Sequence, residues 1–266
     1  MKTFVSQAKD KGASSWLNAL PIVEQHLNLN KEQFSDAMRL RYNIPLSGLP
    51  SHCPCGNPFN VTHALDCKKG GFVSQKHDNL RDMLTHLLGK VCKDVEAEPH
   101  LLPITNEVMD LRTANTSEEA RLDIKAKGFW QRSQTAFFDI RVTHVNSSSQ
   151  RTKPTSAIFR NHEAAKKREY LQRVLEVEQG AFTPLVFGTN GGMGSECQRF
   201  ISQLSSSLAE KSGDSYAAVC TWLRTRLSVE ILKSAITCIR GSRIPFKKQS
   251  TNLEDFGLMN IEAQNK

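Results

Sequence analysis

Residues 121–145, RLDIKAKGFWQRSQTAFFDIRVTHV, contain two consecutive segments with the periodicity and composition of β-strands. The first, residues 121–130, alternates apolar and polar residues, which is the pattern of a strand with one buried face. The predicted buried face holds Leu122, Ile124 and Ala126, and the polar face holds Asp123, Lys125 and Lys127. The second segment, residues 136–145, is rich in β-branched and aromatic residues and is predicted as the next strand. Each strand therefore carries one carboxylate, Asp123 or Asp139.

Asp139 interrupts the apolar run FFDIRV. A carboxylate in such a run is costly to bury unless it is paired or bound to a cation. Mg²⁺ typically binds through one or two carboxylates together with phosphate oxygens of a substrate. The two acids therefore predict a site for Mg²⁺ or Mn²⁺, with Asp123 and Asp139 as ligands. A solvent-facing strand charge is the alternative interpretation of Asp123.

The flanking sequence extends these strands into a mixed α/β pattern. Apolar periodicity and turn residues predict a helix over 75–92, a strand over 97–104, an exposed loop over 106–120, a helix over 163–178 and a strand over 183–192. An earlier helix is predicted over 31–42, where Asn30 and Gln33 have the spacing of a capping box. Two further helices are predicted over 196–211 and 216–240. The fold class predicted is α/β (α+β).

A cluster of cysteines and histidines precedes the predicted core, in SHCPCGNPFNVTHALDCKKGG, residues 51–71. Cys53, Cys55, His63 and Cys67 supply four sulfur or nitrogen donors, the set that tetrahedral zinc requires. His63 and Cys67 are about one helical turn apart, so they share a face. His52 is an alternative to His63, and a loop with free thiols is the alternative to a metal site. The expected role of the zinc is structural.

Residues 78–190 resemble the PD-(D/E)xK restriction-endonuclease-like fold, in which one acid begins a strand and a (D/E)xK element lies on the next. The resemblance implies that Asp123 and Asp139 are these acids. Leu122 replaces the usual proline, and Arg141 occupies the lysine position of the second element. Arginine can hold a phosphate but does not transfer protons. Variants of the fold supply the lysine from the following helix, where this chain offers Lys166 and Lys167.

The arrangement is similar to the endonuclease of non-LTR retrotransposons, which has a Cys/His knuckle just upstream. Three elements carry this resemblance over residues 50–192: the knuckle, Lys166 followed by Tyr170, and the His77-Asp78/Arg81 group. In such elements the domain closes the C-terminal end of a reverse-transcriptase polypeptide, whose aromatic-x-Asp-Asp turn this chain lacks.

The resemblance implies a metal-dependent DNA endonuclease that nicks by phosphodiester hydrolysis. Asp123 and Asp139 would ligate Mg²⁺ or Mn²⁺, Lys166 would stabilise charge, and Glu98 would be a third acid. The expected partner is DNA, with RNA as a second nucleic acid, and the expected location is the nucleus. The alternative, suggested by Arg141, is a catalytically degenerate zinc-containing module that binds nucleic acid.

Composition agrees with an intracellular, basic protein. Of the 266 residues, Lys and Arg exceed Asp and Glu by 8, an excess that favours polyanionic partners. No apolar stretch has the length of a membrane span, and the first residues lack the apolar region of a signal peptide. The predicted parts are an N-terminal helical segment (1–50), a zinc knuckle (51–72), the endonuclease-like core (73–195), C-terminal helices (196–245) and a disordered tail (246–266).

Overall fold

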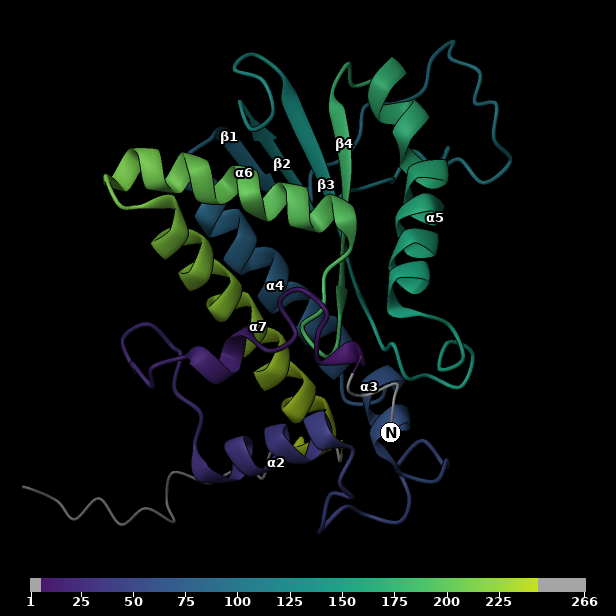
Figure 1. Cartoon of the computed structure of the whole chain (residues 1–266). Coiled ribbons are helices and arrows are strands. Elements are labelled where there is room, and N and C mark those ends of the chain that lie inside the picture. Colours follow the sequence, from purple (N-terminus) through teal and green to yellow (C-terminus); the bar gives the residue numbers. More distant parts are fainter. Residues whose placement is uncertain (1–5, 244–266) are drawn as a thin grey trace, which may run out of the picture.

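The structure is a computed structural model, and it describes residues 6–243 (Figure 1). The predicted disordered tail, residues 246–266, lies outside the described residues. The helices are the 3-10 helix η1 (Ser15–Asn18) and the α-helices α2 (Lys31–Tyr42), α3 (Val61–Asp66), α4 (Phe72–Gly89), α5 (Thr155–Glu176), α6 (Ser195–Ser212) and α7 (Tyr216–Arg240). The strands are β1 (Lys93–Ala97), β2 (Ile124–Lys127), β3 (Thr135–Thr143) and β4 (Ala181–Gly188). In the described part of the chain, none of the helices has the length and apolar character needed to cross a membrane.

The four strands form one mixed sheet in the order β1-β2-β3-β4. β1 pairs with β2 and β2 pairs with β3 in antiparallel fashion, whereas β3 and β4 are parallel. A parallel pair needs a long crossover, and α5 provides it. The structure confirms the predicted class, a fold with both α-helices and a β-sheet.

Helices cover both faces of the sheet (Figure 1). On one face, Phe138 and Ile140 of β3 pack in the main core with side chains of α4, α6 and α7. On the other face, Phe137 packs against Tyr170 and Val174 of α5. Residues of β3 therefore alternate between the two layers, and Asp139 projects toward α5 because it shares the face of Phe137.

Helix α7 joins the N-terminal segment and the Cys/His region to the core. Near its middle, Val229 and Leu232 pack with Trp16 and Ala37. Closer to its end, Ala235, Cys238 and Ile239 pack with Ala64 and Leu65 of α3. Segments that precede the sheet in sequence thus pack against α7, which follows it, through buried side chains.

The predicted capping box of α2 is confirmed. The Asn30 side chain accepts from the Gln33 backbone N–H at 2.8 Å, and the Gln33 side chain accepts from the Asn30 backbone N–H at 3.0 Å. Together these bonds satisfy two backbone donors at the start of the helix.

Several predicted boundaries were wrong, and those of β1 and α5 differ most from the structure. The strand predicted over 97–104 lies earlier, because β1 is the polar edge segment Lys93–Ala97, and Pro99 and Pro103 cannot donate to a strand ladder. Helix α5 begins at Thr155, eight residues before the predicted start. Its first turns are held by Ile158 and Phe159, which pack with Val145 and Val186.

The predicted face of the first strand also needs correction. Ile124 and Ala126 lie in the core cluster on the α4 side, but Leu122 packs with Phe137 and Tyr170 on the α5 side. Regular pairing in β2 begins only at Ile124, so the alternation does not extend back through Asp123.

Candidate functional site

The four predicted zinc ligands meet at one point. One donor atom from each of Cys53, Cys55, His63 and Cys67 lies within 4.8 Å of the other three. Cys53 Sγ and Cys67 Sγ are 3.8 Å apart, and Cys55 Sγ is 3.3 Å from His63 Nε2. Two thiolates bound to one zinc at about 2.3 Å lie about 3.8 Å apart in a tetrahedron. The donor set and its spacing therefore fit a metal ion.

Local backbone structure brings these donors together. Gly56 adopts φ +91°, a left-handed conformation that glycine accepts readily, and its N–H donates to Cys53 O to close the CPCG turn. The Asn60 side chain caps α3 by accepting from the backbone N–H of His63 at 2.9 Å. Hydrogen bonds from Asn57 lower the pKa of the Cys55 thiol to about 6, which favours the thiolate form that binds metal.

The structure selects His63 rather than His52. His52 forms an isolated bridge with Pro58, and its Nδ1 lies 3.2 Å from Ser51 Oγ. His52 therefore lies in the bridged segment at the start of the knuckle and is not one of the four grouped donors.

The second predicted site centres on Asp139 of β3. Its side chain is buried, and Lys166 Nζ of α5 donates to Asp139 Oδ1 at 3.2 Å. Lys166 also pairs with Glu169 Oε2 at 3.3 Å and lies over the Tyr170 ring. Burial raises the pKa of Asp139 to about 6, against the opposing effect of Lys166. The carboxylate is therefore ionised at neutral pH and paired with a half-buried ammonium.

Asp123 lies at the entrance to β2, next to the backbone of β3. Its Oδ2 accepts from the Ile140 N–H, and its Oδ1 is 2.9 Å from His77 Nε2 on α4. The hydrogen bond with Asp123 raises the pKa of His77, although burial opposes it. Asp123 also contributes to the raised pKa of Asp139 through like-charge repulsion, so the two carboxylates act on one another.

Glu98 and Lys167 pair with residues outside the two acids, and Arg141 is exposed. Glu98 is exposed at the end of β1, and its carboxylate pairs with Arg81 of α4 rather than joining Asp123 and Asp139. Lys167 pairs with Glu196 of α6, so Lys166 is the lysine that reaches Asp139. Arg141 shares the face of Asp139 on β3 and is exposed.

One unsatisfied atom bears on whether a cation fits at the acids. Asp139 Oδ2 is buried and has no hydrogen-bond partner. A buried carboxylate oxygen without a donor is costly, and a divalent cation is one group that would satisfy it. Both Asp123 oxygens are already engaged, one by His77 and one by Ile140. Of the two acids, Asp139 Oδ2 is therefore the oxygen without a protein partner, and a cation bound there would satisfy it.

Two residues that contact the site, His77 and Glu169, have no predicted role in the sequence. His77 approaches Asp123 from α4, 46 positions away in sequence, and its place beside Asp78 and Arg81 was the available signal. Glu169 pairs with Lys166 from three positions along α5, a spacing that favours such pairs.

No protein-family model matches the chain, and a search of the curated proteins finds no match.

Proposed function

We propose that the chain is a metal-dependent DNA endonuclease that nicks one strand by phosphodiester hydrolysis. The observation that carries the proposal is the buried Asp139 carboxylate, with one oxygen paired to Lys166 and the other without a donor. A basic chain with this pair of acids fits a reaction in which a phosphate must be held and its negative charge offset. A nuclear location follows from DNA as the substrate and is part of the same proposal.

Asp139 and Asp123 would hold Mg²⁺ or Mn²⁺, which when bound activates water and offsets charge on the phosphate. Lys166 supplies a fixed positive charge beside Asp139, positioned by its contacts with Glu169 and Tyr170. Its role is to stabilise the extra negative charge that develops on the phosphate oxygens. His77 holds the Asp123 carboxylate in one orientation.

Zinc at the Cys/His group would have a structural role. All four protein ligands are present, which leaves no open coordination position, as expected for structural rather than catalytic zinc. Lys68 and Lys69 follow the last ligand and are exposed, which places positive charge beside the knuckle for contact with phosphates.

A second function has its own support. Both oxygens of Asp123 already have hydrogen-bond partners, and Glu98 is paired with Arg81. Acids that are already paired with protein groups are less available to a catalytic metal. This favours a module that binds nucleic acid through the knuckle and the basic surface of the chain and does not cleave the nucleic acid. Arg141 at the lysine position of the resemblance supports the same alternative.

The test is relaxation of supercoiled plasmid in Mg²⁺ or Mn²⁺, with binding measured in parallel over a range of salt concentrations. We expect wild-type protein to nick, Asp139→Asn to lose nicking by at least about 100-fold, and DNA affinity to be retained. Lys166→Gln should lower the rate by about 10²-fold or more. Lys167→Gln is the matched control and should remain within about twofold, because Lys167 pairs with Glu196 instead.

Three outcomes would contradict all or part of the endonuclease proposal. Folded protein with its zinc bound that binds DNA in a salt-dependent manner but never nicks it supports the binding module. Equal rates for Lys166→Gln and wild type would reject the assigned role of Lys166. Neither binding nor nicking at low salt would reject both nucleic-acid functions.

A further inference from the structure

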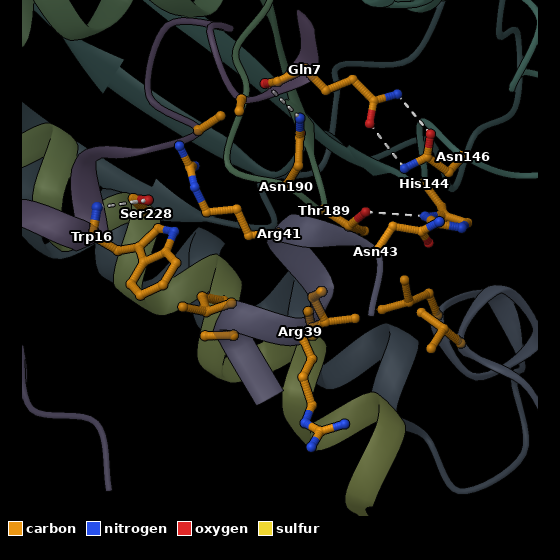
Figure 2. Close-up of a pocket in the computed structure, with 18 of the residues that line it drawn as sticks. Gln7, Trp16, Arg39, Arg41, Asn43, His144, Asn146, Thr189, Asn190 and Ser228 are labelled. Atoms are coloured by element: carbon orange, nitrogen blue, oxygen red, sulfur yellow. Dashed lines mark hydrogen bonds between the residues drawn. The ribbon is translucent and has the colours of Figure 1, made fainter. Parts of the chain in front are cut away.

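A cavity of about 200 Å³ is lined by none of the residues assigned above to the two sites, although it borders α3, the helix that carries His63. It is lined by the N-terminal segment, α2, α3, α7 and the turns that follow β3 and β4, and it is partly open to solvent (Figure 2). An apolar cavity of about 150 Å³ is enough to hold benzene. The cavity therefore has room for a body the size of one ring together with a small polar group.

Its walls combine apolar and polar side chains. Trp16, Ala37, Leu40 and Leu232 provide apolar surface from η1, α2 and α7. Figure 2 labels a group of amide and hydroxyl side chains, Asn43, Asn146, Thr189 and Asn190, together with His144, and it places the Ser228 hydroxyl beside Trp16. A cavity with apolar walls and a few grouped polar side chains is the usual form of a small-molecule site.

Arg41 is a half-buried cation with free hydrogen-bonding capacity at this cavity. Its Nη1 donates to Ser14 Oγ at 2.7 Å, whereas its Nε is buried and has no hydrogen-bond partner. No Asp or Glu lines the cavity, and none of the described carboxylates lies within ion-pair distance of Arg41. Arg41 lines the cavity, so an anion bound there would supply the negative charge that no described carboxylate provides for this guanidinium.

Arg39, two residues earlier on α2, provides the contrast. Its Nη1 donates to Pro45 O at 2.7 Å. Figure 2 shows its guanidinium extending away from Asn190 and Gln7, whereas the Arg41 side chain extends toward the side of the cavity where Ser228 and Trp16 lie. The two arginines share charge, helix and approximate exposure, but only the Nε of Arg41 is buried without a partner.

We propose that this cavity binds a small organic acid in its anionic form. Its acid group accepts from Arg41, and its apolar body, about the size of one ring, packs against Trp16, Leu40 and Leu232. Thr62 of α3 and His144 after β3 share a wall of the cavity and lie 3.4 Å apart. A bound ligand thus spans the contact between the knuckle helix, the N-terminal segment and the end of the sheet. This site is independent of the endonuclease proposal.

The test uses benzoate, phenyl phosphate and the neutral isostere benzyl alcohol as probes of the full-length protein with zinc bound. Binding is followed by ¹H–¹⁵N spectra that include the Arg41 Nε–H and the side-chain amides of Asn43 and Asn190. We expect saturable shifts at these groups with at least one acid, with Kd on the order of 1 mM for so small a probe. Benzyl alcohol should bind at least about tenfold more weakly.

The matched variants are Arg41→Gln and Arg39→Gln. We expect Arg41→Gln to weaken binding of the acid at least about tenfold and Arg39→Gln to leave Kd within about twofold. A preference for benzoate or for phenyl phosphate identifies the acid group as a carboxylate or a phosphate. The wild-type comparison of acid with alcohol remains decisive if Arg41→Gln fails to fold.

Three results would overturn the proposal. They are equal affinities for benzoate and benzyl alcohol, equal effects of the two arginine substitutions, and no saturable shift with either acid up to about 20 mM, well above the expected Kd.

Discussion

At the scale of single residues, the acidic site depends on opposing effects on one carboxylate. Burial and the neighbouring Asp123 raise the pKa of Asp139, while Lys166 lowers it, and the result is about 6. For Lys166, burial lowers the pKa, but the charges of Asp139 and Glu169 outweigh it and the net shift is upward. Both groups are therefore charged near neutral pH, and removing either would leave a buried charge without its partner.

His162 on α5 provides a titration that can be tested apart from the acids. Its Nε2 is 3.1 Å from both Thr143 Oγ1 and Gln150 Nε2, so it accepts hydrogen bonds in the neutral form. Burial, with Arg141 and Lys153, lowers the pKa of His162 from 6.5 to about 4. Because the folded-state pKa is depressed, the stabilising contribution is present above pH 6.5 and is lost as the pH falls toward 4.

We expect an imidazole NMR titration to give a pKa for His162 well below 6.5. The difference in urea midpoint between wild type and His162→Gln should also shrink between about pH 7 and about pH 4.5. Comparing the two proteins at each pH cancels the titration of other groups. A difference that stays constant over this range would contradict the prediction.

At the scale of elements, α5 joins the acidic site to the long loop after β1. Lys166 faces Asp139, and one turn later the Tyr170 hydroxyl accepts from Asn115 Nδ2 at 3.2 Å. Arg173, which is 1% exposed, donates to the backbone carbonyls of Leu102, Asn115 and Ser117 at 2.8–2.9 Å. A loop that the sequence marks only as polar and exposed is therefore held along one helix face.

Arg173→Gln should release this loop. Glutamine cannot reach three carbonyls from one position, so we expect a loss of about 2–4 kcal/mol in the free energy of unfolding. Hydrogen exchange should rise mainly in residues 101–120. Arg168→Gln is the matched control on the same helix, because Arg168 is exposed and its loss should change stability by less than about 0.5 kcal/mol. Unchanged exchange in the loop would contradict the role of Arg173.

Elements defined by local sequence patterns were predicted correctly, whereas those defined by contacts between distant segments were not. The capping box at Asn30, the strand pattern of β3 and the Cys/His spacing are local, and they were predicted correctly from short windows of sequence. β1, with the sequence KDVEA, is an edge strand defined by its partner and carries no apolar signal. The contact between His77 and Asp123 is set by packing of α4 on the sheet, so the local His77-Asp78/Arg81 group marks the residue but does not reveal its partner.

At the scale of the whole molecule, α7 packs against both the knuckle helix α3 and the main core. Ala235 and Ile239 pack on α3, and earlier turns of α7 belong to the main core beneath the sheet. Arg243, just beyond the helix, donates to Ala64 O at 3.1 Å and lies 5.1 Å from the ring centroids of Phe59 and Phe72. Loss of the metal should therefore affect the end of α7 as well as the knuckle.

Removal of the proposed zinc tests this connection. Four ligands in a site of this kind contribute folding free energy directly, so a zinc chelator or Cys55→Ser should lower Tm by at least about 10 °C. Amide protection should fall in residues 53–67 and in the last turns of α7, whereas β3 and β4 should keep theirs because the main core does not include the knuckle. Metal analysis of wild-type protein should give one zinc per chain.

Cys92→Ser is the control for loss of a thiol, because Cys92 lies outside the group of four donors and packs at the edge of the main core. It should retain the zinc and the protection pattern, with stability within about 1 kcal/mol of wild type. Zinc-free wild-type protein with an unchanged Tm would contradict a structural metal. Side chains of the knuckle and of the end of α7 pack in one buried cluster, so metal removal is expected to lower protection in both segments. Protection lost in the knuckle alone would agree with a structural metal but would contradict its effect on α7.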